Sequence, residues 1–255
     1  MFKVLFISYY FPPMGLSGVQ RSLKFAKYLK QFDWEPTVLT TVDTSYYAHD
    51  YSLLKEAETA ELNIVRVDGK HINLKLGKKK EIKMPREFIR KTLSNLSKVF
   101  FIPDNKIGWS NAAYIKAKEI LSKEKFDLIY VTCPPFSSFM TAAKLKKDFG
   151  LPLFVDYRDL WNGNQFSFVP TPYHKIKHKN YEYASLKAAD RVVVINRRIK
   201  ERILKQYPFL TFDNVSIIPH GFDPEDFENA VKINKPNNKL IMTYSGIFYE
   251  NITPK

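Results

Sequence analysis

The first thirty residues join an apolar strand to a helix through a loop with two prolines and two glycines. Within a strand over 3–8, residues 4–7 form an unbroken apolar run, typical of a parallel strand covered on both faces. Gly15 and Gly18 then interrupt regular structure, and Ser17 is a candidate N-cap for a helix over 19–31. This stretch constrains the fold most, because it predicts the first strand–loop–helix step of an α/β protein.

Such a loop is suited to bind phosphate. The N-terminus of the following helix presents free backbone N–H groups and the positive end of a dipole, and both favour anionic oxygens. A glycine lets a ligand approach the backbone closely. The alternative is that Gly15 and Gly18 only form a turn, which is the commoner case for two isolated glycines. The remainder of the chain favours the phosphate interpretation.

Strands and helices alternate along the rest of the chain, without a hairpin signal. This order predicts an α/β fold with a doubly wound, parallel, Rossmann-like sheet. The predicted strands cover residues 3–8, 34–40, 62–67, 126–131, 151–156, 189–195 and 215–219.

Composition changes near the C-terminus. Residues 229–238 are polar and predict a linker, and residues 239–255 start a second strand-and-glycine unit without completing it. We therefore expect a Rossmann-like domain over 1–228 and the start of a truncated second domain after the linker.

Three sets of candidate site residues follow predicted strands, at the edge where open α/β sheets bind ligands. The most informative is the Asp-Tyr-Arg-Asp sequence at 156–159, whose carboxylates can accept a hydroxyl proton while the guanidinium orients them or binds an anion. A structural ion pair around the arginine is the alternative. The candidates are Gly15 and Gly18 for phosphate; Cys133, Pro134, Phe136 and Ser137 in a second loop; and Asp156, Arg158 and Asp159 as catalytic residues.

Positive charge is concentrated in one segment. The chain carries a net charge of +14, and residues 70–98 hold 10 Lys/Arg against 2 Asp/Glu, a net of +8. After Pro85, apolar residues recur at three-to-four spacing, which predicts a basic amphipathic helix. It can contact an anionic membrane or pack as an ordinary surface helix, and the sequence favours neither. Nucleic acid is disfavoured, because no recognition-helix or aromatic sheet pattern is present. The candidate contacts are Lys78, Lys79, Lys80, Lys83, Arg86 and Arg90.

The single cysteine, Cys133, excludes an internal disulfide and fits a reducing compartment. Neither a signal peptide nor a membrane-spanning run is visible, so we expect a cytoplasmic protein, with attachment at the inner face of the plasma membrane as an option. His174 and His178 lie among lysines, within a segment over 162–180 that we expect to be irregular. Two histidines without carboxylate support do not make a metal site, so we predict a solvated basic loop and no metal.

Several segments together resemble the family-four, GT-B-fold glycosyltransferases of bacterial surface-polysaccharide assembly. The first is the opening stretch with its Pro-Pro-Met-Gly-Leu-Ser-Gly loop, and the others follow in order along nearly the whole chain. They are residues 3–22, 132–138, 150–161, 181–195, 218–223 and 243–249.

The resemblance implies the N-terminal, acceptor-side half of a GT-B fold. It implies a retaining hexosyltransferase that moves a sugar from a nucleotide-diphosphate sugar to a hydroxyl of a glycan or lipid-linked acceptor, without a required metal or other cofactor. The Gly15/Gly18 loop would face the donor diphosphate. Many relatives carry a histidine in the loop after the fourth strand, but Thr132-Cys-Pro-Pro-Phe136 has none, so no catalytic residue can be transferred there. The donor domain is missing, so we expect this chain alone to be inactive.

Other interpretations remain. A non-catalytic Rossmann-like domain that binds a phosphorylated ligand would use the same cleft. A dehydrogenase is disfavoured, because the third glycine of the dinucleotide motif is absent and Thr40-Thr41 stands where a ribose-binding acid would follow the second strand.

Overall fold

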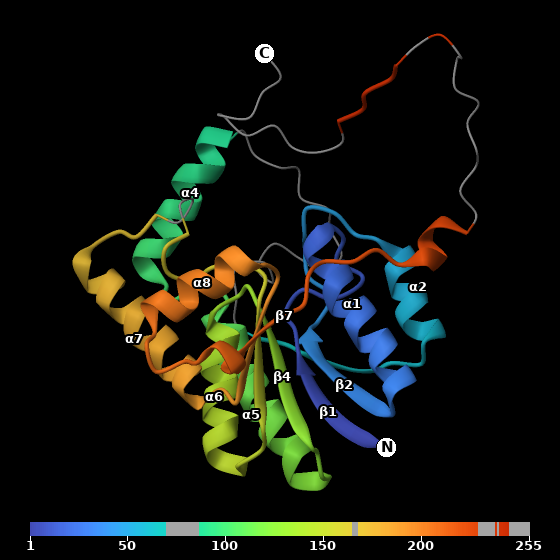
Figure 1. Cartoon of the computed structure of the whole chain (residues 1–255), viewed down its shortest axis with the longest axis horizontal. Coiled ribbons are helices and arrows are strands. Elements are labelled where there is room, and N and C mark those ends of the chain that lie inside the picture. The colour runs from blue at the N-terminus through green and yellow to red at the C-terminus, as the bar shows by residue number, and fades with distance from the viewer. Residues whose placement is uncertain (70–86, 165–167, 229–237, 239, 245–255) are drawn as a thin grey trace. The chain divides into compact units, whose positions relative to one another are not determined.

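The computed structural model describes residues 1–69, 87–164, 168–228, 238 and 240–244 (Figure 1). The chain divides into two units, Met1–His220 and Gly221–Lys255. The first unit contains the whole sheet, so the candidate site can be built from it alone.

A seven-stranded parallel sheet in the order β3-β2-β1-β4-β5-β6-β7 forms the centre of the first unit. All seven predicted strands are present, and the doubly wound α/β class is confirmed. The strands are β1 (Phe2–Ile7), β2 (Trp34–Thr41), β3 (Asn63–Val67), β4 (Leu128–Cys133), β5 (Leu153–Tyr157), β6 (Arg191–Val194) and β7 (Val215–Ile217).

The strand order reverses between β1 and β4, which lie side by side at the middle of the sheet. Residues 4–7 of β1 are at most 1% exposed, which explains their unbroken apolar run. Ile7 is in register with Val131 of β4, so the loops after both strands leave from neighbouring points. A reversal of this kind is where doubly wound folds bind ligands.

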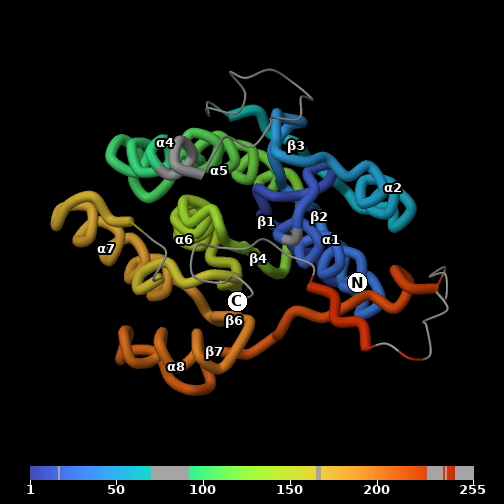
Figure 2. Tube along the Cα trace, turned by 90° about the horizontal axis from the view of Figure 1, so that it is seen from above, coloured from blue at the N-terminus to red at the C-terminus, as the bar shows by residue number. Residues whose placement is uncertain are grey.

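Helices cover both faces of the sheet (Figure 2). Helices α1 and α2 pack together on one face, and α5, α6 and α7 lie side by side on the other. The helices are α1 (Ser17–Leu29), α2 (Tyr51–Thr59), α4 (Glu87–Phe100), α5 (Ile107–Lys123), α6 (Ser137–Phe149), α7 (Pro172–Ala188) and α8 (Arg197–Gln206).

Helix α7 begins at Pro172, so the prediction of a solvated basic loop over 174–179 is wrong. The hydroxyl of Thr171 accepts a hydrogen bond from the His174 backbone N–H at 3.4 Å, and a proline is favoured in a first helical turn. The His174 side chain is buried, with Nε2 3.1 Å from the carbonyl oxygen of Val99. Among the described residues no group of three or more potential metal ligands is present.

Two smaller differences concern helix starts. Helix α1 begins at Ser17 with Leu16 in the N-cap position, so the prediction that Ser17 is the cap is wrong. Leu16 has φ +72° and ψ 161°, a backbone conformation that glycine adopts much more easily than leucine. Helix α2 was not predicted; its cap is the carboxylate of Asp50, which accepts bonds from the N–H groups of Ser52 and Leu53.

In the second unit, Pro224–Phe227 form a short 3-10 helix. Residues 240–244 are not in a strand, so the strand expected to begin near residue 239 is absent from the described part of that segment. A parallel strand requires a neighbouring strand for its backbone hydrogen bonds. None of the described helices is both long and apolar enough to cross a bilayer.

Candidate functional site

Three loops at the carboxyl edge of the sheet meet around the buried guanidinium of Arg158. Its Nε donates to the carbonyl of Cys133 at 3.0 Å, its Nη2 to that of Pro134 at 2.9 Å, and its Nη1 to that of Gly18. One side chain therefore connects residues from all three predicted sets. The acceptors are main-chain carbonyls, and among the described residues no carboxylate forms an ion pair with Arg158, so the loops meet around a positive charge.

Gly18 lies in the first turn of α1 and is exposed. A Cβ atom at this position would be 3.4 Å from Nη1 of Arg158, so a side chain here would contact the guanidinium. Gly18 thus combines a helix N-terminus, which favours anions, with the nearby charge of Arg158.

Gly15 has a different environment. It is buried, its N–H donates to the carbonyl of Ala48 at 2.9 Å, and a Cβ at residue 15 would lie 3.3 Å from that oxygen. Because Gly15 has no side chain, the loop that contains Ala48 can lie close to its backbone. Its predicted phosphate contact stays a prediction.

Asp156, at the end of β5, is paired with Arg21 of α1 rather than with Arg158. The Arg21 Nε and Nη2 donate to the two carboxylate oxygens at 3.0 and 2.9 Å, and the Thr132 hydroxyl donates to Oδ2 at 3.0 Å. Both side chains of the pair are almost completely buried, at 3% and 1% exposed. Of the predicted catalytic residues only Asp159 is exposed, so Asp156 has the environment of a structural anchor.

Arg21 was not among the predicted site residues. Its Nη1 donates to the carbonyl of Pro219 at 3.1 Å, and its guanidinium lies 4.2 Å from the ring centre of Phe25. Its carboxylate partner is 135 residues away in sequence, so no local pattern identifies it.

Two charged residues, the half-buried Asp104 and the buried Lys106, precede α5. Asp104 accepts bonds from the N–H and the hydroxyl of Ser137 at 2.9 and 2.8 Å, and so positions the N-terminus of α6. Burial raises the pKa of Asp104, and these hydrogen bonds oppose the shift. Burial lowers the pKa of Lys106 to about 8, with Asp104 opposing, and the ammonium lies 5.0 Å from the ring centre of Tyr9.

The loop over 133–137 is largely buried. Cys133 is fully buried, and burial raises the pKa of its thiol, which makes it a poor nucleophile. Phe136 stacks on Trp161 with ring centres 4.9 Å apart, and Pro134 is half-buried. The loop contributes main-chain carbonyls and a helix N-terminus to the site rather than reactive side chains.

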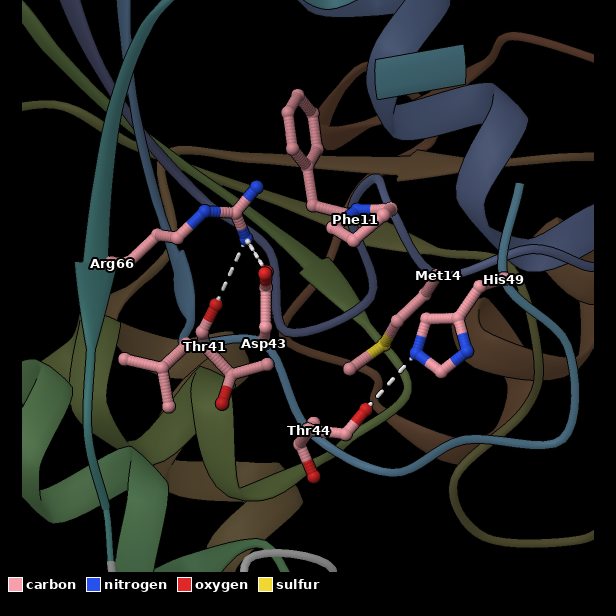
Figure 3. Close-up of a pocket in the computed structure, with 9 residues that line it drawn as sticks. Phe11, Met14, Thr41, Asp43, Thr44, His49 and Arg66 are labelled. Carbon is pink, nitrogen blue, oxygen red and sulfur yellow. Dashed lines mark hydrogen bonds and ion pairs between the residues drawn. The ribbon is translucent and has the colours of Figure 1, made fainter. Parts of the chain in front are cut away.

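A small pocket lies beside the Gly15 loop, at the carboxyl ends of β2 and β3 (Figure 3). Its main charged group is Arg66, which lies 3.6 Å from a carboxylate oxygen of Asp43 and donates to the carbonyl of Thr41 at 3.1 Å. His49 lies opposite, with Nε2 3.1 Å from the carbonyl oxygen of Thr44. No local sequence pattern indicates this pocket, because its residues come from three separate segments.

Most of the predicted basic contacts cannot be placed. Lys78, Lys79, Lys80, Lys83 and Arg86 lie outside the described residues. Arg90 lies within α4, but its side chain is also outside the description. Their role stays a prediction.

Comparison with solved structures defines the class of fold. The chain superposes on sucrose-phosphate synthase of Thermosynechococcus elongatus with a TM-score of 0.52 at 14% identity, covering 88% of this chain and 49% of that one. Anabaena HepE, solved in complex with UDP-glucose, gives a TM-score of 0.50 at 13% identity, with coverage of 89% and 48%. This chain thus has the Rossmann-like fold of GT-B glycosyltransferases and spans about half the length of these two neighbours.

The sequence comparison is more specific. The model of Glycosyltransferase Family 4 matches residues 16–226, which is most of the chain. The chain therefore belongs to Glycosyltransferase Family 4. A comparison with curated protein sequences found no match.

Proposed function

We propose that this chain is the acceptor-side domain of a retaining hexosyltransferase, which moves a sugar from a nucleotide-diphosphate sugar to a hydroxyl of a glycan or lipid-linked acceptor. The observation that carries the proposal is the positively charged edge around Arg158, next to the N-terminus of α1 at Gly18. A diphosphate leaving group gains negative charge as the sugar departs, and donors fixed at that place stabilise it. Family membership and the UDP-glucose complex of HepE agree with this choice of donor class.

The proposal assigns no metal or other cofactor. The N–H groups at the start of α1 would donate hydrogen bonds to the diphosphate, and the nearby positive charge of Arg158 would attract it. Asp159 has an exposed carboxylate that could bind substrate hydroxyls. Asp156 and Arg21 would hold this edge in place without touching substrate. The setting we propose is cytoplasmic polysaccharide biosynthesis at an anionic membrane surface, with positive charge over 70–98 for attachment.

The test is to compare this chain with a longer protein that also carries a donor-binding domain. The chain spans about half of its structural neighbours, so we predict that it transfers no sugar by itself and that a longer protein carrying a donor-binding domain does. A panel of nucleotide sugars with glycan and lipid-linked acceptors measures this. Sugar transfer by the 255-residue chain would contradict the prediction. Nucleotide binding without transfer by the longer protein would favour the non-catalytic alternative.

A substitution at Gly18 tests the phosphate loop. In the longer protein, Gly18→Val is expected to weaken nucleotide binding by about tenfold or more, because its side chain would reach Arg158 and crowd the helix N-terminus. Calorimetry measures the affinity, and thermal unfolding checks that the fold persists. Gln20→Val is the control, because Gln20 is an exposed residue of the same helix and the substitution introduces the same side chain there. Unchanged affinity in Gly18→Val would favour the plain-turn interpretation.

A further inference from the structure

The apolar side of helix α4 faces solvent. Leu93, Leu96 and Phe100 are spaced so that they lie on one side of the helix, and their exposed fractions are 57%, 52% and 77%. Lys98 lies on the other side, half-buried, where burial lowers its pKa. A surface helix normally packs its apolar side against the protein, whereas the apolar side of α4 is exposed to solvent.

Helix α7 also carries exposed apolar residues, and its start lies near α4. Nε2 of the buried His174 lies 3.1 Å from the carbonyl oxygen of Val99, which places the start of α7 beside the end of α4. Figures 1 and 2 both show the two helices on the same side of the sheet. Tyr173 and Ile176 are 58% and 60% exposed. Together, Leu93, Leu96, Phe100, Tyr173 and Ile176 are called the α4–α7 surface below.

The charges around the α4–α7 surface are positive. Residues 168–180 contain three lysines and no acidic residue, and Lys175 and Lys179 are exposed. Helix α4 itself contains Arg90, Lys91 and Lys98 against Glu87, a net charge of +2. A patch that combines exposed apolar groups with surrounding cations marks a contact surface rather than a random exposure.

We propose that the α4–α7 surface is the face by which the protein lies on an anionic lipid bilayer, with Leu93, Leu96 and Phe100 inserted at the boundary of headgroups and acyl chains. A bilayer supplies both complements at once, because anionic headgroups attract the lysines and the acyl region accepts the apolar stripe. A second copy of this chain would bring like charges together. The inference deepens the membrane attachment proposed above and does not depend on the transfer reaction.

Insertion can be measured at a single position, because the native cysteine is fully buried. A Phe100→Cys variant of the full chain is labelled with a polarity-sensitive thiol dye and mixed with phosphatidylcholine vesicles with and without phosphatidylglycerol. We expect a blue shift of the emission only with the anionic vesicles. Phe32→Cys is the matched control, because Phe32 is 71% exposed but lies outside the α4–α7 surface, and it should show no shift.

A second variant measures the contribution of the apolar stripe. Leu93→Ser/Leu96→Ser should lower the affinity for anionic vesicles by about tenfold or more, whereas Phe32→Ser should not change it. Replacing Lys78, Lys79, Lys80 and Lys83 with Glu should abolish binding to anionic vesicles. High salt should abolish the remaining binding of the serine variant, because that variant retains only charge attraction.

The results distinguish insertion of the apolar residues from attachment by charge alone. Binding to anionic vesicles without a shift at residue 100, or with unchanged affinity in the serine variant, would overturn insertion and leave attachment by charge alone. No binding to either kind of vesicle at low salt would overturn both. A blue shift that appears without vesicles and grows with protein concentration would show that a second copy covers the surface, which also overturns the inference.

Discussion

Replacing Asp156 with alanine is expected to lower the free energy of unfolding by about 3–5 kcal/mol, because it leaves the Arg21 guanidinium buried without its carboxylate. The loss also removes the acceptor of the Thr132 hydroxyl. Urea unfolding followed by circular dichroism measures the change. We expect nucleotide binding by the longer protein to fall with it, because Arg21 and Asp156 join α1 to β5 at the edge where Arg158 lies.

The control is an ion pair on the surface. Arg197 and Glu201 form an i,i+4 pair on α8 with side chains 85% and 60% exposed. Glu201→Ala should therefore cost less than about 1 kcal/mol. The double variant Arg21→Met/Asp156→Leu should recover much of the loss, because it leaves no unpaired charge. An Asp156→Ala variant no less stable than Glu201→Ala would show that the buried pair does not hold this edge.

Replacing Lys106 with methionine is expected to have the opposite effect and to stabilise the protein at pH 7 by about 2–3 kcal/mol. The lysine is 6% exposed, and burial lowers its pKa to about 8 from the usual 10.5. At pH 7 the folded state therefore still holds an ammonium, but at a cost in free energy relative to the unfolded chain. A methionine fills a similar volume without the charge, so the buried ammonium no longer opposes folding.

The pH dependence gives this prediction a distinct signature. Between pH 8 and 10.5 the unfolded chain binds more protons at Lys106 than the folded chain does, so the lysine makes stability rise with pH over that window. Its unfavourable contribution is complete below pH 8 and vanishes above 10.5. The difference between wild type and Lys106→Met should shrink across this range, and Lys55→Met, at an exposed position, should show little difference at any pH. A difference that does not vary with pH would mean that the lysine is not charged and buried as described.

Much of the fold follows from local patterns. The apolar run of β1 predicts a strand buried on both faces, and the alternation of strands with helices predicts the parallel sheet. The start of α7 does not follow from these patterns, because Pro170 and Pro172 interrupt regular structure in the segment over 162–180. A proline after a capping threonine is in fact a helix-start signal.

The site was less accessible to sequence reasoning. The strand ends were identified correctly as the place where Gly18, Cys133 and Arg158 meet, because topology brings all carboxyl ends to one edge. The ion-pair partner of Asp156 was not identified, because Asp156 pairs with Arg21, which is 135 residues away in the sequence. For Gly15 the phosphate contact stays a prediction, and the close neighbour that the structure shows is Ala48.

The hydrogen bond from Arg21 to the carbonyl of Pro219 holds the C-terminal end of the first unit in place. Pro219 is next to the last residue of that unit, and its carbonyl is held by a guanidinium that is itself locked to the end of β5. The chain therefore leaves from a fixed point at the carboxyl edge and not from a loose terminal loop. A tether that starts at a fixed point beside a site gives whatever it carries a high effective concentration there. The origin of any tether that starts at His220 is thus anchored to the sheet by the same guanidinium that binds Asp156.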